Sequence, residues 1–439
     1  MQVFQFLRFF TFLIISIVFA KTSLTEKEIG DWEYVMFLTG ALSFSWVTGF
    51  MQSFMTLFKR NRIFHSPKST FSPTKESPEF FNAFLLLSGF SLFFALFILI
   101  INKNIPVFSN LEPIPYVQWV ALYFFLSQPS ALIEYIYLLR NKPRYILYYG
   151  FITFGLQVVL SCGAIFLGMG IGGAICWGLV FVSGIRFLWL LALLKKYAAF
   201  QFSWKFIKDN LYIGYPIVVS CLLTGSSQYV DGLIASIAFD AENFAIFRYG
   251  AKELPFVVVM TTALSNALIP EFATRKNMPA LLEEIKVKSL RMMHFLFPLS
   301  IVFMLFSKFL FANVLFRDVF TRSADIFMVY QLMVISRVLF PQTILIGLKK
   351  TQFIMRASAV TLLVNIPVSL ILVQYYDVVG IALGTMLVHI LEKIILVAYN
   401  HLRMGIRMET YIPIPWFLFY CALITLVFVL IDHRVIVLW

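Results

Sequence analysis

The sequence predicts an all-α protein that crosses a membrane many times, and three observations support this prediction. The 439 residues are 60% hydrophobic and only 13% charged, with a mean hydropathy of +0.86, far too apolar for a water-soluble domain. The apolar residues occur in blocks of about 20 or more, each long enough to cross roughly 30 Å of hydrocarbon as a helix. A backbone in lipid must satisfy its own hydrogen bonds, so these blocks are expected to be helical.

We expect thirteen membrane-spanning segments. Their ranges are 3–20, 34–58, 80–101, 116–139, 145–167, 171–194, 211–239, 244–268, 292–314, 326–348, 353–373, 378–398 and 412–431. The first twelve form two sets of six. The expected domains are therefore an N-terminal six-helix bundle at 1–196, an interfacial cytoplasmic linker at 197–210, a C-terminal six-helix bundle at 211–400, and an extra helix and tail at 401–439.

An internal repeat with an offset of 210 residues indicates that the two bundles arose by duplication. Three matches fall at this offset: Gly40-Ala41 with Gly250-Ala251, Arg140 with Lys350, and Gly170-Ile171 with Gly380-Ile381. Six spans are an even number, so both copies are expected to have the same orientation, related by an axis along the membrane normal. This parallel arrangement is typical of transporters.

The distribution of Lys and Arg predicts the orientation of the chain. The loops after the even-numbered segments, together with Arg8, contain 23 basic residues, whereas the opposite loops and the C-terminus contain six. Basic loops are normally cytoplasmic, so the N-terminus is expected in the cytoplasm. This topology accounts for the net charge of +13, and we expect no nucleic-acid partner. All four cysteines lie within apolar segments, so neither a disulfide framework nor a zinc cluster is expected.

Six basic residues lie inside the apolar segments, where charge is costly and normally faces a cavity or a partner. They are Arg186, Arg248, Lys252, Lys308, Arg337 and Lys393. One interpretation is structural ion pairing, for example between Lys252 and Glu253 or between Lys393 and Glu392. The other interpretation is a site that binds an anion.

The arginines favour the anion site. Arg186, Arg248 and Arg337 have no acidic residue at helical spacing on their own segment. A guanidinium fork fits phosphate oxygens in a bidentate manner, so a water-filled cavity that attracts an anion is one expectation for these residues. Among the embedded acids, Asp231 is the best candidate for binding a coupling cation, and an ion pair with a neighbouring helix is its alternative.

Three stretches of the chain resemble the multidrug, oligosaccharidyl-lipid and polysaccharide (MOP) exporter superfamily, particularly its bacterial polysaccharide flippase branch. They are residues 6–40, residues 247–276 with the sequence FRYGAKELPFVVVMTTALSNALIPEFATRK, and residues 375–390 with the sequence YYDVVGIALGTMLVHI. The resemblance implies two parallel six-helix bundles around a central cationic cavity. It further implies a polyprenyl-diphosphate-linked oligosaccharide as substrate, membrane lipids and other polysaccharide-assembly proteins as partners, and a multi-pass protein of the bacterial inner membrane.

The resemblance also implies site residues. The substrate-binding candidates are Arg8, Arg186, Arg248, Lys252 and Arg337. In related lipid II flippases, a sodium site joins an Asp, an Asn and an Asp four residues apart, and a Thr. The matching positions here are Asp231, Asn365 with Ser369, and Thr385. Ser369 stands where those relatives have a carboxylate, so the coupling ion could be sodium on a weakened site, a proton, or none. No other cofactor is implied.

The function that follows is a flippase without covalent chemistry, and it has three rivals. One is an ion-coupled exporter of a drug or of lipid II; segment 3–20 contains no acid, which argues against the drug branch. The second is a major-facilitator carrier, whose Gly, Asp and Arg signature is missing from residues 59–79. The third is a membrane enzyme of polysaccharide assembly, which needs a large outer loop or a reactive His, and neither is evident in the sequence.

Overall fold

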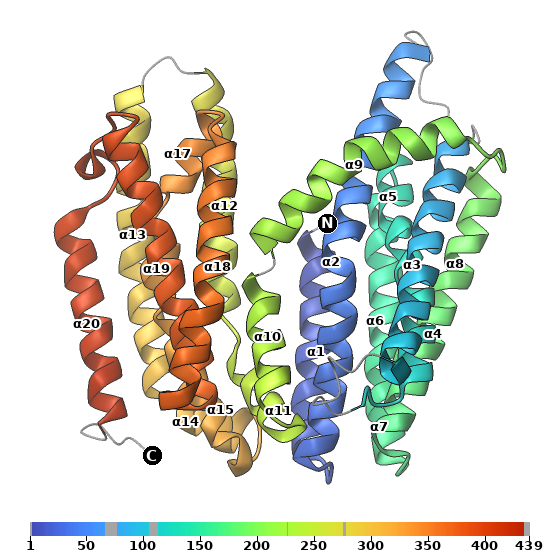
Figure 1. The fold of residues 1–439 in the computed structure, drawn as a ribbon, viewed down its shortest axis with the longest axis horizontal. Coiled ribbons are helices and arrows are strands. Elements are labelled where there is room, and N and C mark those ends of the chain that lie inside the picture. Colours follow the sequence, from blue (N-terminus) through green and yellow to red (C-terminus); the bar gives the residue numbers. More distant parts are fainter. Residues whose placement is uncertain (1, 66–76, 105–112, 226, 275–277, 434–439) are drawn as a thin grey trace. The chain divides into compact units, whose positions relative to one another are not determined.

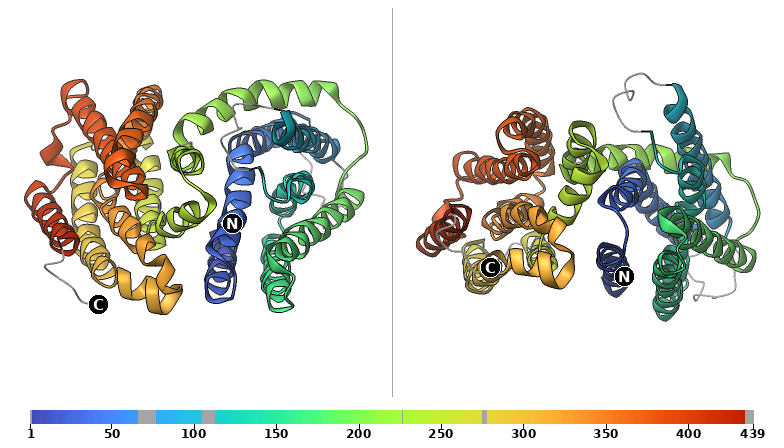
Figure 2. Two further views of the ribbon diagram at one scale, coloured as in Figure 1. Left: turned by 60° about the horizontal axis from the view of Figure 1, so that its bottom comes forward. Right: turned by 90° about the horizontal axis from the view of Figure 1, so that it is seen from below.

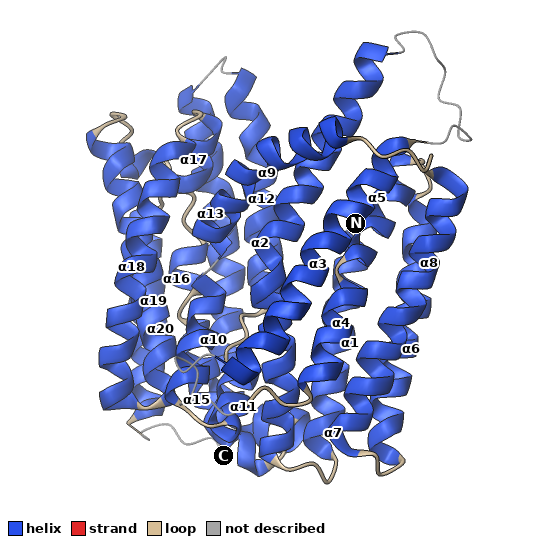
Figure 3. Ribbon diagram, turned by 45° about the vertical axis from the view of Figure 1, so that its right-hand side comes forward, coloured by secondary structure: helices blue, strands red, loops and turns tan. Residues whose placement is uncertain are grey.

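The structure is a computed structural model that describes residues 2–65, 77–104, 113–225, 227–274 and 278–433. Every regular element in these ranges is a helix, and Figure 3 shows only helices joined by short loops. The predicted all-α fold class is therefore confirmed. The chain divides into two compact units, which we describe separately.

Unit 1 contains Met1–Gly225 with Asp240–Glu242. Its helices are α1 (Gln2–Lys21), α2 (Glu26–His65), α3 (Pro78–Asn104), α4 (Val117–Ser127), η2 (Pro129–Ala131), α5 (Leu132–Leu139), α6 (Pro143–Phe166), α7 (Gly170–Gly173), η3 (Ala174–Phe181), α8 (Val182–Tyr197) and α9 (Trp204–Gly225). Helix α1 packs on α6, α3 on α4, and α6 on the π-helical segment η3. The approach of α6 to η3 requires a glycine, because a Cβ on Gly178 would lie 1.8 Å from Ser161 Oγ.

Unit 2 contains Ser226–Phe239 with Asn243–Trp439. Its helices are α10 (Ser227–Ala238), most of α11 (Ala241–Gly250), α12 (Pro255–Thr274), α13 (Met278–Leu305), α14 (Ser307–Phe309), η4 (Leu310–Leu315), η5 (Asp318–Phe320), α15 (Thr321–Gln331), α16 (Val334–Arg337), α17 (Pro341–Gly347), α18 (Thr351–Tyr376), α19 (Val378–Leu402), η6 (Met408–Thr410) and α20 (Ile414–Asp432). Helices α18 and α19 form a tightly packed hairpin, and α20, the extra helix, packs on α13.

The boundary between the units differs from the expected linker at 197–210. Helix α9 belongs to unit 1, because it crosses obliquely over α2 and packs on it (Figure 1, Figure 2). The hydroxyl of Ser53 on α2 donates a hydrogen bond of 3.0 Å to the carbonyl of Asn210 on α9. The expected linker therefore begins a helix of the first unit, and the division falls near Gly225.

Among the described residues, fewer than thirteen uninterrupted spans are found. In the described part of the chain, ten helices are long and apolar enough to cross a membrane, or eleven if the pair Asp318–Arg337 and Pro341–Gly347, bent by 47°, counts as one span. The expected spans 116–139 and 244–268 are helical but interrupted, and the expected span 211–239 includes residue 226, which lies outside the described residues. Both interruptions coincide with a proline, Pro129 before α5 and Pro255 at the start of α12, because proline removes a backbone donor and restricts the preceding residue.

A buried arginine, Arg140, joins three loops at one end of unit 1 by hydrogen bonds and ring contacts. Arg140, which is 3% exposed, donates hydrogen bonds to Ser77 Oγ at 3.2 Å and to the Tyr197 carbonyl at 2.9 Å. Its guanidinium lies 5.1 Å from the ring centres of both Phe80 and Tyr197. Three loops that the charge pattern predicted on one side of the membrane therefore meet at one end of the unit.

Replacing Arg140 by methionine should destabilise the protein. The change removes two charge-assisted hydrogen bonds, each worth roughly 1.5–3 kcal/mol, and two cation–π contacts, each worth roughly 0.5–1 kcal/mol, or about 4 kcal/mol or more in total. Tryptophan fluorescence during thermal unfolding in detergent should show a lower midpoint. The exposed neighbour Arg144, changed to methionine, is the matched control and should unfold like the wild type. Equal midpoints for the two variants would contradict the role given to Arg140.

Candidate functional site

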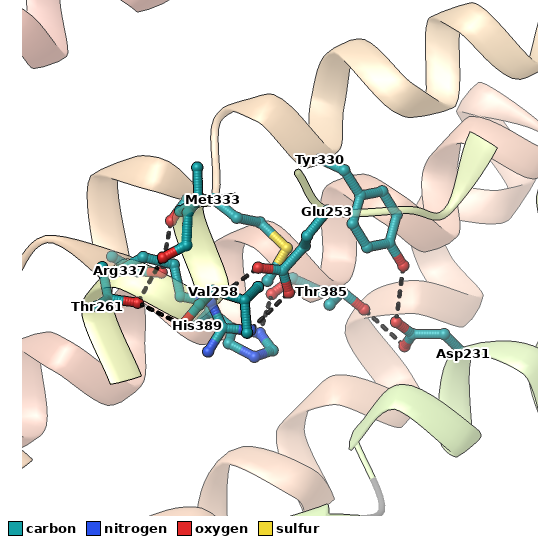
Figure 4. Close-up of polar contacts among 11 residues, drawn as sticks. Asp231, Glu253, Val258, Thr261, Tyr330, Met333, Arg337, Thr385 and His389 are labelled. Atoms are coloured by element: carbon teal, nitrogen blue, oxygen red, sulfur yellow. Dashed lines mark hydrogen bonds and ion pairs between the residues drawn. The ribbon is translucent and has the colours of Figure 1, made fainter. Parts of the chain in front are cut away.

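Four buried polar side chains and one half-buried tyrosine lie together in unit 2, and we call them the Asp231 cluster: Asp231, Tyr330, Asn365, Ser369 and Thr385. The Asp231 carboxylate accepts three hydrogen bonds, from Thr385 Oγ1 at 2.6 Å, Asn365 Nδ2 at 3.1 Å and Tyr330 OH at 3.2 Å. Ser369 Oγ donates to Asn365 Oδ1 at 3.0 Å. Figure 4 shows Tyr330 and Thr385 converging on the carboxylate.

Four helices position the Asp231 cluster. Asp231 lies on α10, Tyr330 on α15, Asn365 and Ser369 one turn apart on α18, and Thr385 on α19. The close contact of α18 with α19 depends on Gly384, where a Cβ would lie 2.3 Å from Ser369 Oγ. The packing of these helices thus brings one carboxylate within reach of three neutral donors.

The donor set of the cluster fits a small hard cation or a proton. Its oxygen atoms are those that hard cations prefer, and the carboxylate supplies the negative charge. In the observed arrangement Asn365 turns its amide nitrogen toward Asp231, and its oxygen accepts from Ser369. A metal ion would therefore require this amide to rotate, whereas a proton would require only a change in the hydrogen bonds to Asp231. Among the described residues, no group of three or more His, Cys, Asp or Glu side chains could hold a metal ion.

The four residues that the sequence proposed for a coupling ion are thus adjacent in the structure. Tyr330, the fifth member, was missed. The chain contains 19 tyrosines, and nothing in the spacing of Tyr330 distinguishes it from the others, since its partner Asp231 is 99 residues away.

A second polar contact in unit 2 joins Arg337 and Glu253, and we call it the Arg337–Glu253 pair. Arg337 Nε donates to Glu253 Oε2 at 2.9 Å, and Nη2 donates to Oε1 at 2.5 Å. The side chains are 32% and 19% exposed. Arg337 is the last residue of α16, and Glu253 lies in the non-helical stretch 251–254 between α11 and α12. This bidentate geometry is the strongest form of an Arg–carboxylate contact.

The pair shows where an acidic partner for Arg337 comes from. None was found at helical spacing on its own segment, and the partner Glu253 lies 84 residues away in the sequence, in the non-helical stretch 251–254. An ion pair between Lys252 and Glu253 was one interpretation of the sequence. In the structure both Glu253 oxygens accept from Arg337, and Lys252 Nζ lies 4.9 Å from the centre of the Tyr249 ring.

Two helical segments link the Asp231 cluster to the Arg337–Glu253 pair, as Figure 4 shows. One contains Tyr330 and Arg337, and the other is α19. Tyr330 and Arg337 are seven residues apart, about two helical turns. On α19, the Thr385 hydroxyl donates to Asp231, and the Thr385 carbonyl lies 2.9 Å from His389 Nδ1. His389 in turn interacts electrostatically with Arg337.

The remaining substrate-binding candidates fall in both units. Arg248, in the last turn of α11, and Lys252 are half-buried in unit 2. In unit 1, Arg186 of α8 donates to Gln157 Oε1 at 2.8 Å, and its guanidinium lies 4.8 Å from the centre of the Phe154 ring. Arg8 on α1 is exposed.

One acid lies near the basic residues of unit 1. Arg8 and Arg186 both interact electrostatically with Glu134 of α5. The half-buried guanidinium of Arg186 is nevertheless hydrogen-bonded to a neutral amide, that of Gln157. Among the described residues of unit 1, Arg186 thus has no ion pair that would have to be broken before an anion binds.

Comparison with known proteins identifies relatives by sequence and by fold. The profile of a family described as polysaccharide biosynthesis protein matches residues 68–325, more than half of the chain. No curated protein matches the sequence. The solved structure of the lipid II flippase MurJ in an inward closed conformation is 17% identical and covers 99% of both chains, with a TM-score of 0.61.

Two further solved structures are similar. An inward-facing multidrug resistance transporter of the MATE family is 14% identical over 90% of this chain and 94% of its own, with a TM-score of 0.64. A MOP superfamily transporter from Pyrococcus furiosus, for which a reversed polarity of the binding pocket is described, is 14% identical over 92% and 93%, with a TM-score of 0.55. These likenesses confirm the expected fold. The chain is therefore a multi-pass membrane protein that belongs to the polysaccharide biosynthesis protein family and has the fold of MOP superfamily transporters.

Proposed function

We propose that the protein is a flippase for a polyprenyl-diphosphate-linked oligosaccharide. It would move this lipid from the inner to the outer leaflet of the bacterial cytoplasmic membrane, with its own N-terminus in the cytoplasm, for the synthesis of a surface or secreted polysaccharide. Support comes from the family match and from the fold shared with a lipid II flippase. The basic loops predicted on the cytoplasmic side support the orientation.

One observation carries the choice of substrate: each unit holds a partly buried guanidinium within an apolar segment. Arg186 contacts the neutral Gln157 and the Phe154 ring, and Arg337 contacts a carboxylate that is itself anionic. A charge in this environment is costly, so it is normally retained for a ligand or a pathway. A diphosphate offers the paired oxygens that a guanidinium fork binds best.

The transport cycle needs no bond to be made or broken. The diphosphate and sugars would pass beside the basic residues while the prenyl tail stays in lipid. Alternating access requires helices that bend, and the interruptions at 251–254 and before Pro341 provide such positions in unit 2. A cation that binds the Asp231 cluster more tightly in one conformation would bias the cycle.

The alternative is an ion-coupled exporter of a drug or of lipid II, or an enzyme of polysaccharide assembly. A drug exporter that captures cations would use acidic residues, and segment 3–20 of this chain contains none. An enzyme would change the substrate chemically, which transport does not. Analysis of the lipid recovered after transport, by mass spectrometry, separates these functions.

A reconstituted flipping assay tests the substrate. In proteoliposomes containing a fluorescent polyprenyl-diphosphate oligosaccharide, the wild type should make the lipid accessible to an external quencher. Arg186→Gln should slow this exposure about tenfold or more, since one charge-assisted contact is worth roughly 1.5–3 kcal/mol. Lys288→Gln, which breaks an exposed ion pair with Glu284, should retain the wild-type rate. If the wild type leaves the lipid in place, the proposed substrate is wrong.

The same assay tests the coupling ion. Imposed sodium and proton gradients should change the wild-type rate for at least one of the two ions, and Asp231→Asn should abolish that response because it removes the only charge of the Asp231 cluster. Glu284→Gln, on the exposed side of α13, is the control and should respond normally. A normal response of Asp231→Asn would exclude the Asp231 cluster as the coupling site.

A further inference from the structure

The Arg337–Glu253 pair connects two helix interruptions in unit 2. Glu253 belongs to the non-helical stretch 251–254 between α11 and α12. Arg337 immediately precedes residues 338–340, where the helix bends by 47° before Pro341. Helix interruptions are the positions at which a membrane helix changes direction most readily. The pair therefore joins two positions that can move without breaking a regular run of backbone hydrogen bonds.

We propose that Glu253 is an internal counter-anion that occupies the Arg337 fork and that a diphosphate must displace, which makes Glu253 a residue that determines anion specificity. This inference rests on the proposed function, because it assigns a role toward the same substrate class. Its test can nevertheless fail while the proposed function stands.

The geometry makes occupancy exclusive. Two nitrogens of the Arg337 guanidinium, Nε and Nη2, both donate to Glu253. A carboxylate and a phosphate group present two oxygens to such a fork in the same way, so both cannot use it at once. A monovalent carboxylate gains no more from the fork than Glu253 already does. A diphosphate has more charge and more oxygen atoms, so it can also contact the neighbouring basic residues.

Those basic residues lie on the same segment as Glu253. Arg248 precedes it by five residues and Lys252 by one. Glu253 and Arg248 both interact electrostatically with the hydroxyl of Tyr330, which places them in one neighbourhood. A diphosphate bound to Arg337 would therefore have the basic side chains of Arg248 and Lys252 nearby. The displaced Glu253 carboxylate would have the same side chains within its neighbourhood.

The Arg337 fork is open enough for a diphosphate to replace Glu253. About a third of the Arg337 side chain and a fifth of the Glu253 side chain are exposed, so the surrounding protein does not enclose the fork and leaves room for an anion to reach it. A second acid, Glu392 on α19, acts electrostatically on Arg337 but accepts its hydrogen bond from Ser358 Oγ at 2.8 Å. Glu392 therefore contributes charge near Arg337 without occupying the fork, which makes it a matched control.

Isothermal titration calorimetry of the full chain in detergent, with inorganic pyrophosphate as the probe and acetate as the competitor, tests the inference. Glu253→Gln should bind pyrophosphate roughly tenfold more tightly than the wild type, because the fork no longer has an anionic occupant. Acetate should also compete with pyrophosphate for the fork of this variant, so the ratio of the affinities for pyrophosphate and acetate should be smaller than in the wild type.

Two control variants test whether the effect depends on the fork. In Glu253→Gln combined with Arg337→Gln the gain in pyrophosphate affinity should vanish, and the pyrophosphate affinity of Glu392→Gln should stay within about twofold of the wild type. Glu253→Asp, whose shorter side chain reaches the fork less well, should gain affinity in the same direction and replaces Glu253→Gln if the latter does not fold.

The outcomes separate the inference from the proposed function. Unchanged or weaker pyrophosphate binding by Glu253→Gln, an equal gain in Glu392→Gln, or a gain that persists without Arg337 would each overturn the role of Glu253. If the wild type moves the lipid-linked oligosaccharide but Glu253→Gln shows no gain, the function stands and this inference fails. If Glu253→Gln gains affinity but the wild type does not move the lipid, the displaceable counter-anion stands and the substrate proposal fails.

Discussion

The need to satisfy backbone hydrogen bonds without water governs this structure. Lipid offers no partner to a free N–H or C=O, so a spanning chain must be helical wherever it faces hydrocarbon. The interruptions in unit 2 obey the same constraint by local bonds: Lys252 N donates to the Gly250 carbonyl at 2.7 Å, and Val257 N to that of Leu254 at 3.0 Å. An interruption is thus stable only where the protein itself supplies partners, and Glu253 and Arg337 lie at two such positions.

The two units hold embedded charge in different ways. In unit 1, Arg186 is balanced by a neutral amide and an aromatic face, which compensate little of its charge. In unit 2, Arg337 has a full carboxylate partner, and the carboxylate of Asp231 has only neutral donors. One unit therefore exposes positive charge to a ligand directly, whereas the other must first exchange one anion for another.

Much of this was predictable from sequence because hydropathy and helical spacing are local properties. They predicted the all-α fold and, with the family resemblance, the residues around Asp231. Asn365 and Ser369 were proposed because the resemblance implies that they match the sodium-site positions of related flippases. The partners Tyr330 and Glu253 were not found, because contacts over 84 or more residues depend on how helices pack. The boundary at Gly225 was missed for the same reason, since hydropathy does not show that α9 packs on α2. The 210-residue repeat and the parallel orientation of the halves stay predictions.

The position of Tyr330 and Arg337 on one short segment has a thermodynamic consequence. A ligand of the Asp231 cluster acts on the hydrogen bond of Tyr330, and an anion acts on Arg337 about two turns further along the same segment. If either ligand prefers one position of this segment, it changes the affinity for the other ligand, and linkage requires the change to be equal in both directions. A cation gradient would then drive the movement of the anionic lipid, and a gradient of the lipid would equally drive the movement of the cation. The transporter would run in reverse when the free energy stored in the lipid gradient exceeds that stored in the cation gradient.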